Sequence, residues 1–150
     1  NLSTSQPLPS TPIHFIHTSC TFLTRTAVYR EENQLKIDYP SLLISRGSLP
    51  RAKNPRVGSI VKNEIRFTWD DNSLMGSASP TDLAGFFFCS PDAEDTWVAF
   101  PVGLRGDKAY DFKFEENNFS GYDVHTWMFF MREDGSDRSD SVYTGVVKVA

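Results

Sequence analysis

Three histidines are the residues of this chain best suited to ligate a metal or to transfer a proton near neutral pH. His14 and His17 lie three positions apart, and on a helix that spacing would direct both toward one metal ion. Neighbouring Ser, Thr and Pro residues argue against a helix. His125 lies in an apolar stretch without a Gly-x-Ser-x-Gly element or another nucleophile signature. We therefore expect no metal, no cofactor and no catalytic residue, and we interpret His125 as a structural histidine bonded across a sheet.

Oxygen-bearing side chains also gather in the loop 134–140, where Asp134, Asp137 and Asp140 alternate with Gly and Ser. Oxygen ligands at such positions suit calcium. The loop lacks a closing Glu and places Arg138 in its middle, so a hairpin turn explains it better. The acid pairs at 94–95 and 115–116 are typical of solvated loops.

Length and charge exclude several classes of function. The 150 residues carry a net charge of −4, and the isoelectric point of about 5.3 argues against nucleic acid as the main partner. No apolar run is long enough to span a membrane.

The two cysteines, Cys20 and Cys89, could form one disulfide, but we favour a free Cys89 that serves as a small buried apolar side chain.

Strand signals recur about every dozen residues, and helix signals are scarce. The residues from Ile65 to Trp69 alternate apolar and polar, as half-buried strands do. We predict an all-β, antiparallel two-layer sandwich of seven to eight strands, similar to immunoglobulin or fibronectin-III modules. The expected strands are 35–39, 42–44, 65–69, 83–89, 96–102, 110–115, 122–131 and 141–149. The expected divisions are an extended leader or arm over 1–34, a strand and linker packed on the sandwich over 35–55, and the sandwich over 56–150.

Two of these strands are apolar on both faces, which a two-layer sandwich does not explain by itself. In 122–131, Trp127, Phe129 and Met131 lie opposite Val124 and its same-face neighbours. Either the N-terminal segment through Ile44 covers this second face, or a partner does, and the partner could be another protein, a second copy of the chain or a sugar.

Six short motifs stand in this order along the chain: Ile37-Asp38-Tyr39, Ser45-Arg46-Gly47-Ser48-Leu49-Pro50, Phe67-Thr68-Trp69-Asp70-Asp71-Asn72-Ser73, Val124-His125-Thr126, Glu133-Asp134-Gly135 and Ser141-Val142-Tyr143-Thr144-Gly145. Taken together, they resemble an uncharacterised family of gut-bacterial proteins over about residues 25–150. The resemblance implies no activity, cofactor or catalytic residue. It implies a longer, partly helical N-terminal region without an export signal, which residues 1–24 do not match. We thus expect a divergent or shortened member, with a cytoplasmic location favoured over secretion.

The function expected from the sequence is a non-enzymatic module for protein interaction or structural assembly. Its predicted interaction surface is Trp127, Phe129, Met131 and Trp97, through which a protein partner or a second copy would bind. The alternative is a carbohydrate-binding module in which Trp97 or Trp127 stacks on sugar rings. A hydrolase is the third and least favoured hypothesis.

Overall fold

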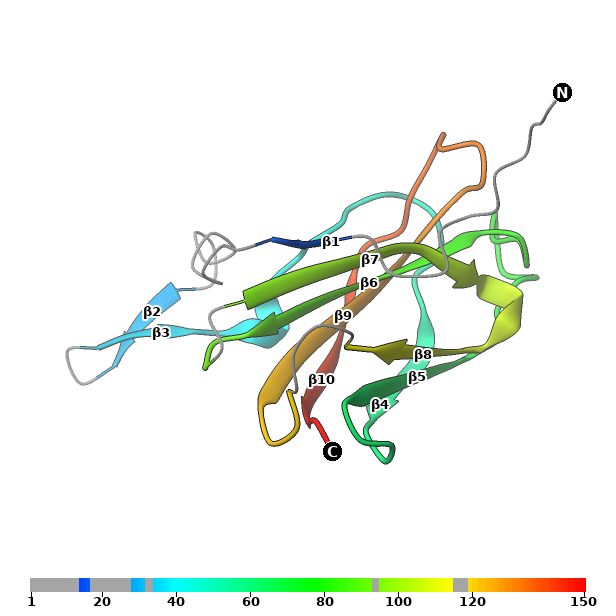
Figure 1. The fold of residues 1–150 in the computed structure, drawn as a ribbon. Helices are drawn as coiled ribbons and strands as arrows, with labels where there is room; N and C mark the ends of the chain where they lie inside the picture. Colours follow the sequence, from blue (N-terminus) through cyan, green and yellow to red (C-terminus); the bar gives the residue numbers. More distant parts are fainter. Residues whose placement is uncertain (1–13, 17–27, 32–33, 93–94, 115–118) are drawn as a thin grey trace, which may run out of the picture.

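Two antiparallel β-sheets face each other and form the body of the molecule (Figure 1). The computed structural model describes residues 14–16, 28–31, 34–92, 95–114 and 119–150, with side chains over 38–92, 97–114 and 119–150. The larger sheet has the order β1 (His14–Ile16), β7 (Asp95–Leu104), β6 (Leu83–Ser90), β9 (Asp123–Met131) and β10 (Val142–Lys148). The smaller sheet has the order β4 (Lys53–Gly58), β5 (Glu64–Asp70) and β8 (Ala109–Lys113). The all-β two-layer sandwich predicted from the sequence is confirmed.

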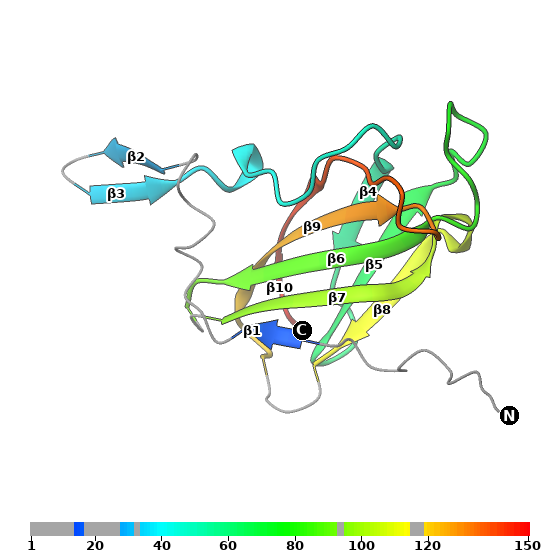
Figure 2. The ribbon, with the colours of Figure 1, turned by 90° about the horizontal axis from the view of Figure 1, so that it is seen from above.

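A hairpin of β2 (Val28–Glu31) and β3 (Gln34–Ile37) forms a separate two-stranded sheet beside the sandwich (Figure 2). The helical elements of the described residues are two single turns of 3₁₀ helix, η2 (Tyr39–Ser41) and η3 (Arg105–Asp107). Among the described residues, no helix has the length and apolar character needed to cross a membrane.

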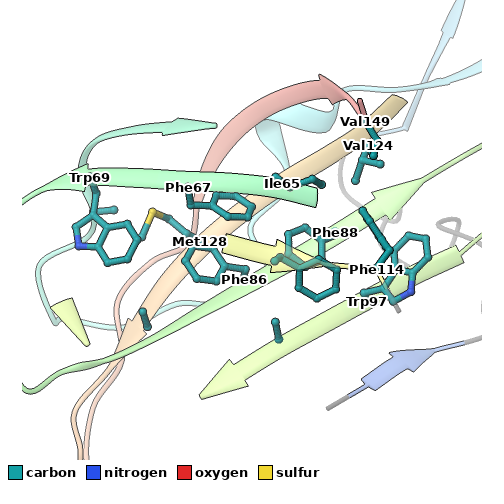
Figure 3. Close-up of a cluster of buried hydrophobic side chains, with 14 of the residues drawn as sticks. Ile65, Phe67, Trp69, Phe86, Phe88, Trp97, Phe114, Val124, Met128 and Val149 are labelled. Carbon is teal, nitrogen blue, oxygen red and sulfur yellow. The ribbon is translucent and has the colours of Figure 1, made fainter. Parts of the chain in front are cut away.

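Aromatic side chains fill the space between the two sheets (Figure 3). The alternation in β5 directs Ile65, Phe67 and Trp69 inward, and all three are buried. Phe67 stacks on Phe86 of the facing sheet with ring centroids 4.2 Å apart. Such offset ring pairs add to the free energy gained by burying the rings themselves. The same alternation leaves the polar residues of β5 on the outer face of the small sheet.

A short segment covers the second apolar face of the large sheet. Residues 38–49, which we call the strap, lie across the outer face of β6 and β9. The apolar side chains of the strap contact a buried cluster on these strands. The cluster consists of Leu42, Phe87, Cys89 and Trp127, with Tyr39, Ile44, Val98 and Tyr143 packed against it. The hypothesis that the segment through Ile44 covers this face is confirmed for this cluster.

Two local predictions are wrong. Residues 42–44 belong to the strap and form no strand, because the amide of Ile44 donates to Ser141 Oγ, 2.8 Å away, and not to a neighbouring strand. The linker expected at the end of 35–55 contains the start of β4 at Lys53. A register shift between Lys53 and Arg56, with Asn54 at φ 48°, disrupts the alternation that would have revealed this strand. The division of the chain at 34 and 55 stays a prediction.

A buried arginine closes one end of the sandwich. Arg105 is fully buried, and its Nε lies 2.8 Å from Asp82 Oδ2. Its other guanidinium nitrogens donate to Asn72 Oδ1 at 2.7 Å and to the Pro50 carbonyl at 2.8 Å. The indole of Trp69 donates to the Arg105 carbonyl at 2.8 Å. One guanidinium thus ties together the segment before β4, the loop after β5 and the start of β6.

Replacing this arginine should cost far more than replacing an exposed one. Arg105→Leu leaves the Asp82 carboxylate buried without its counter-charge, so we expect a loss of about 3–5 kcal/mol in the free energy of unfolding. Arg66→Leu is the matched control, because the Arg66–Asp111 pair at 2.9 Å is about half exposed and should contribute about 1 kcal/mol or less. Urea denaturation followed by circular dichroism measures both. Equal losses for the two variants would contradict the role given to Arg105.

Candidate functional site

The four residues of the predicted interaction surface do not share one face. Trp127 is fully buried under the strap, and Phe129 lies against Phe100 with ring centroids 5.4 Å apart. Met131 is half-buried at the end of β9. Trp97 points the opposite way, into the core between the sheets, where it meets Phe114 edge-on at 5.3 Å. Binding through these four residues stays a prediction, and the structure places two of them in separate buried clusters.

His125 takes part in a stacked aromatic cluster under the strap. The ring of Tyr39 stacks on the imidazole with centroids 3.6 Å apart and an angle of 13° between the planes. His125 Nδ1 is hydrogen-bonded to the Tyr143 hydroxyl on β10 at 2.8 Å. The sequence predicts a histidine bonded across the sheet at this position, and the bond to Tyr143 joins β9 to β10. The cluster fixes the position of η2, from which the strap begins.

The electrostatics of this cluster favour neutral side chains. Burial lowers the pKa of His125, and the negative charge of Asp123 opposes part of that shift. Burial also raises the pKa of Tyr39, to which Asp92 adds, and it raises the pKa of Tyr143. The imidazole and both phenols are therefore uncharged at neutral pH. The cluster is suited to packing and hydrogen bonding.

The acidic loop 134–140 binds the strap. Asp137 Oδ2 accepts a hydrogen bond from the Ser48 hydroxyl at 2.6 Å, and Asp140 Oδ1 accepts one from the Gly47 amide at 3.1 Å. Asp134 accepts the amide of Ser136, two residues further along the same turn, at 2.8 Å. Within the part of the chain that the structure describes, no group of three His, Cys, Asp or Glu side chains could hold a metal ion. The hairpin-turn interpretation explains these carboxylates. The side chains of His14 and His17 lie outside the described residues.

The outer face of the small sheet carries a groove that the sequence analysis missed. The groove encloses about 370 Å³ and lies over Gly58, Arg66 and Asp111, with Ile60 and Val61 at its margin. Gly58 pairs with Arg66 across the strands, and a Cβ added to Gly58 would meet no atom within 4 Å. The missing side chain of Gly58 therefore contributes to the hollow. The sequence signal for the groove is the polar alternation of β5, because the register shift in β4 hides that strand from a pattern of period two.

The groove combines apolar and charged surface. Ile60 is 92% exposed and Val61 is 57% exposed, which is unusual for two adjacent aliphatic residues. Arg66 Nη1 donates to both oxygens of the Asp111 carboxylate at 2.9 Å. Beside it, hydrogen bonds from Asn54 and then Arg56 hold the pKa of Asp70 below its ordinary value. Both ion pairs lie on the surface, where a bound ligand could reach them.

The expectation of a free Cys89 is wrong. Cys89 on β6 is fully buried and disulfide-bonded. The other cysteine of the sequence, Cys20, lies outside the described residues. Separation along the chain does not reveal which cysteines the fold brings together, and this is why the sequence could not decide the question.

The two facing sheets and the strap define an antiparallel β-sandwich module. The chain belongs to a family of unknown function, DUF6266, whose model matches residues 16–145. The match includes the strap, the His125 cluster and the groove. No curated protein matches the chain.

The His125 cluster predicts a pH dependence of stability. Because the folded-state pKa of His125 lies below its ordinary value of about 6.5, the unfolded chain takes up the proton first. The neutral form of His125 therefore favours the folded state fully above about pH 6.5. This contribution to the free energy of unfolding is lost as the pH falls through and below that value. We expect the melting temperature to fall between pH 7.5 and 5.5, and to fall less in His125→Gln, measured by scanning calorimetry. An equal fall in both proteins would show that His125 is not the group responsible.

Proposed function

We propose that this member of DUF6266 is a non-enzymatic module that binds another protein, and that the groove on the outer face of the small sheet is its binding site. The observation that carries the proposal is the pair of exposed aliphatic residues, Ile60 and Val61, at the margin of a hollow of about 370 Å³. An exposed apolar patch beside a concave surface is typical of interaction sites.

The order of the strands supports an immunoglobulin-like module. If β4 to β10 are lettered A, B, C, C′, E, F and G, the two sheets are ABE and GFCC′. This is the order of an immunoglobulin-type sandwich in which C′ takes the place of D. Because such folds host many activities, the proposal depends on the groove and not on the fold.

The use made of His125 supports a non-enzymatic role. Its ring is stacked under Tyr39 and bonded to Tyr143, so it serves to hold the strap. A general base would instead lie within reach of a substrate proton. In the groove, each arginine is paired with a carboxylate, an arrangement suited to recognition.

Burial of the tryptophans weighs against the carbohydrate alternative, which needs an exposed ring for stacking. Trp69, Trp97 and Trp127 are 2%, 7% and 0% exposed. The groove margin offers aliphatic and charged side chains instead. A protein partner therefore fits the described surface better than a sugar.

The disulfide at Cys89 bears on location. Disulfides persist mainly in oxidising compartments. We therefore propose that this module acts outside the cytoplasm, as the secreted alternative holds, and the disulfide at Cys89 supports this proposal.

Filling the groove tests the proposal. Gly58→Leu places a side chain in open space at a position that does not need a positive φ, so the fold should be retained. Peptides selected from a random phage-displayed library on the wild-type protein should bind Gly58→Leu at least about tenfold more weakly, by fluorescence anisotropy.

Leu74→Ser provides the matched control, because Leu74 is 99% exposed in the loop after β5 and does not line the groove. It should bind the same peptides as the wild type does. The proposal fails if the selected peptides bind Gly58→Leu and the wild type equally well, or if the library yields no binder.

A further inference from the structure

The charges around the groove differ in sign from those of the whole chain. We consider the charged residues of β4, β5, β8 and the loop 59–63, which connects β4 to β5. The cations are Lys53, Arg56, Lys62, Arg66 and Lys113, and the acids are Glu64, Asp70 and Asp111. The excess of two positive charges contrasts with the net charge of −4 for the chain. This face is therefore a local positive region on an acidic protein.

Local pairing leaves lysines and one acid as the available charges, because Glu64 lines the groove opposite Lys113 and no ion pair among the described residues engages it. Asp70 and Asp111 are bound by Arg56 and Arg66, at 3.1 and 2.9 Å. Among the described residues, no ion pair joins Lys62 or Lys113 to an acid. Lys62 follows Ile60 and Val61 directly, so a cation with no acid partner among the described residues lies next to the exposed aliphatic margin.

From this arrangement we propose the chemistry of the partner, an inference that rests on the proposed function. The groove takes an extended acidic segment of another protein, with an aliphatic side chain seated over Gly58. The carboxylates of the segment extend past the groove lining to Lys62, which follows Val61, and to Lys113, which pairs with Glu64 across the strands. Charge complementarity of this kind guides association and selects partners. Apolar contact at Ile60 and Val61 supplies the area removed from water.

A nucleic acid would also present negative charge, but the groove suits it less. Binding of single strands without sequence preference relies on aromatic side chains that stack on bases. The groove margin is aliphatic, and the aromatic side chains of β5 and β8 belong to the buried core or pack against it. We therefore favour a peptide, and an oligonucleotide becomes one arm of the test.

The test compares three labelled probes of equal length by fluorescence anisotropy. One is a peptide with a central Leu flanked by Glu, the second has the same Leu flanked by Lys, and the third is a single-stranded oligonucleotide. We expect only the Glu peptide to bind. Its affinity should fall several-fold in concentrated salt, because screening weakens exposed charge pairs. Lys62→Glu and Gly58→Leu should each weaken binding about tenfold, and Leu74→Ser should leave it unchanged.

The possible failures are distinguishable. Equal binding of the Lys peptide or the oligonucleotide, or Glu-peptide binding unaffected by salt and by Lys62→Glu, overturns the acidic partner. The acidic partner is also overturned if the Glu peptide does not bind while library-selected peptides still bind and lose affinity in Gly58→Leu. In that case the groove keeps its proposed function as a protein-binding site. If the protein alone dimerises in sedimentation equilibrium and Gly58→Leu abolishes dimerisation, the occupant is a second copy. Absence of every groove-dependent binder removes both proposals.

Discussion

The constraint on which the structure depends is that the central strands β6 and β9 are apolar on both faces. A strand directs successive side chains to opposite sides of its sheet, so a second sheet can bury only one of these faces. The small sheet covers the inner face, where Phe86 and Phe88 meet the rings of β5 and β8. The strap covers the outer face over Phe87 and Trp127. The large sheet is thus the middle layer of a locally three-layered molecule.

Polar contacts with the loop 132–141 hold the strap in place. Ser141 Oγ accepts the amides of Ile44 and Ser45, and Asp137 and Asp140 bind the following turn. The chain comes so close there that a Cβ on Gly47 would lie 1.8 Å from the carbonyl oxygen of Arg138. Two of the motifs that carry the family resemblance, 45–50 and 141–145, are therefore partners in space.

Regular alternation made much of the fold predictable, and irregular backbone concealed the rest. The strands around Ile65 and Phe112 follow a period of two, and the strand around Trp127 is a long apolar run. Their positions and the two-layer arrangement therefore follow from the sequence. The bulge in β4 removes that period, and with β4 the groove was missed. The strap has no period either, because the amides of Ile44, Ser45 and Gly47 bind side chains instead of a neighbouring strand. Disulfide pairing and the separation of Trp97 from Trp127 depend on tertiary geometry, which single-sequence patterns do not contain.

The strap covers part of the outer face of the large sheet, and the outer face of the small sheet carries the groove and its charged residues. The account therefore depends on the strap being a fixed part of the fold. Amide hydrogen exchange at Ile44 and Ser45, resolved by NMR, measures this most directly. We expect both amides to exchange as slowly as those of β9, because both are bound to Ser141. Exchange at the rate of an unstructured peptide, while β9 remains protected, would contradict a covered sheet face.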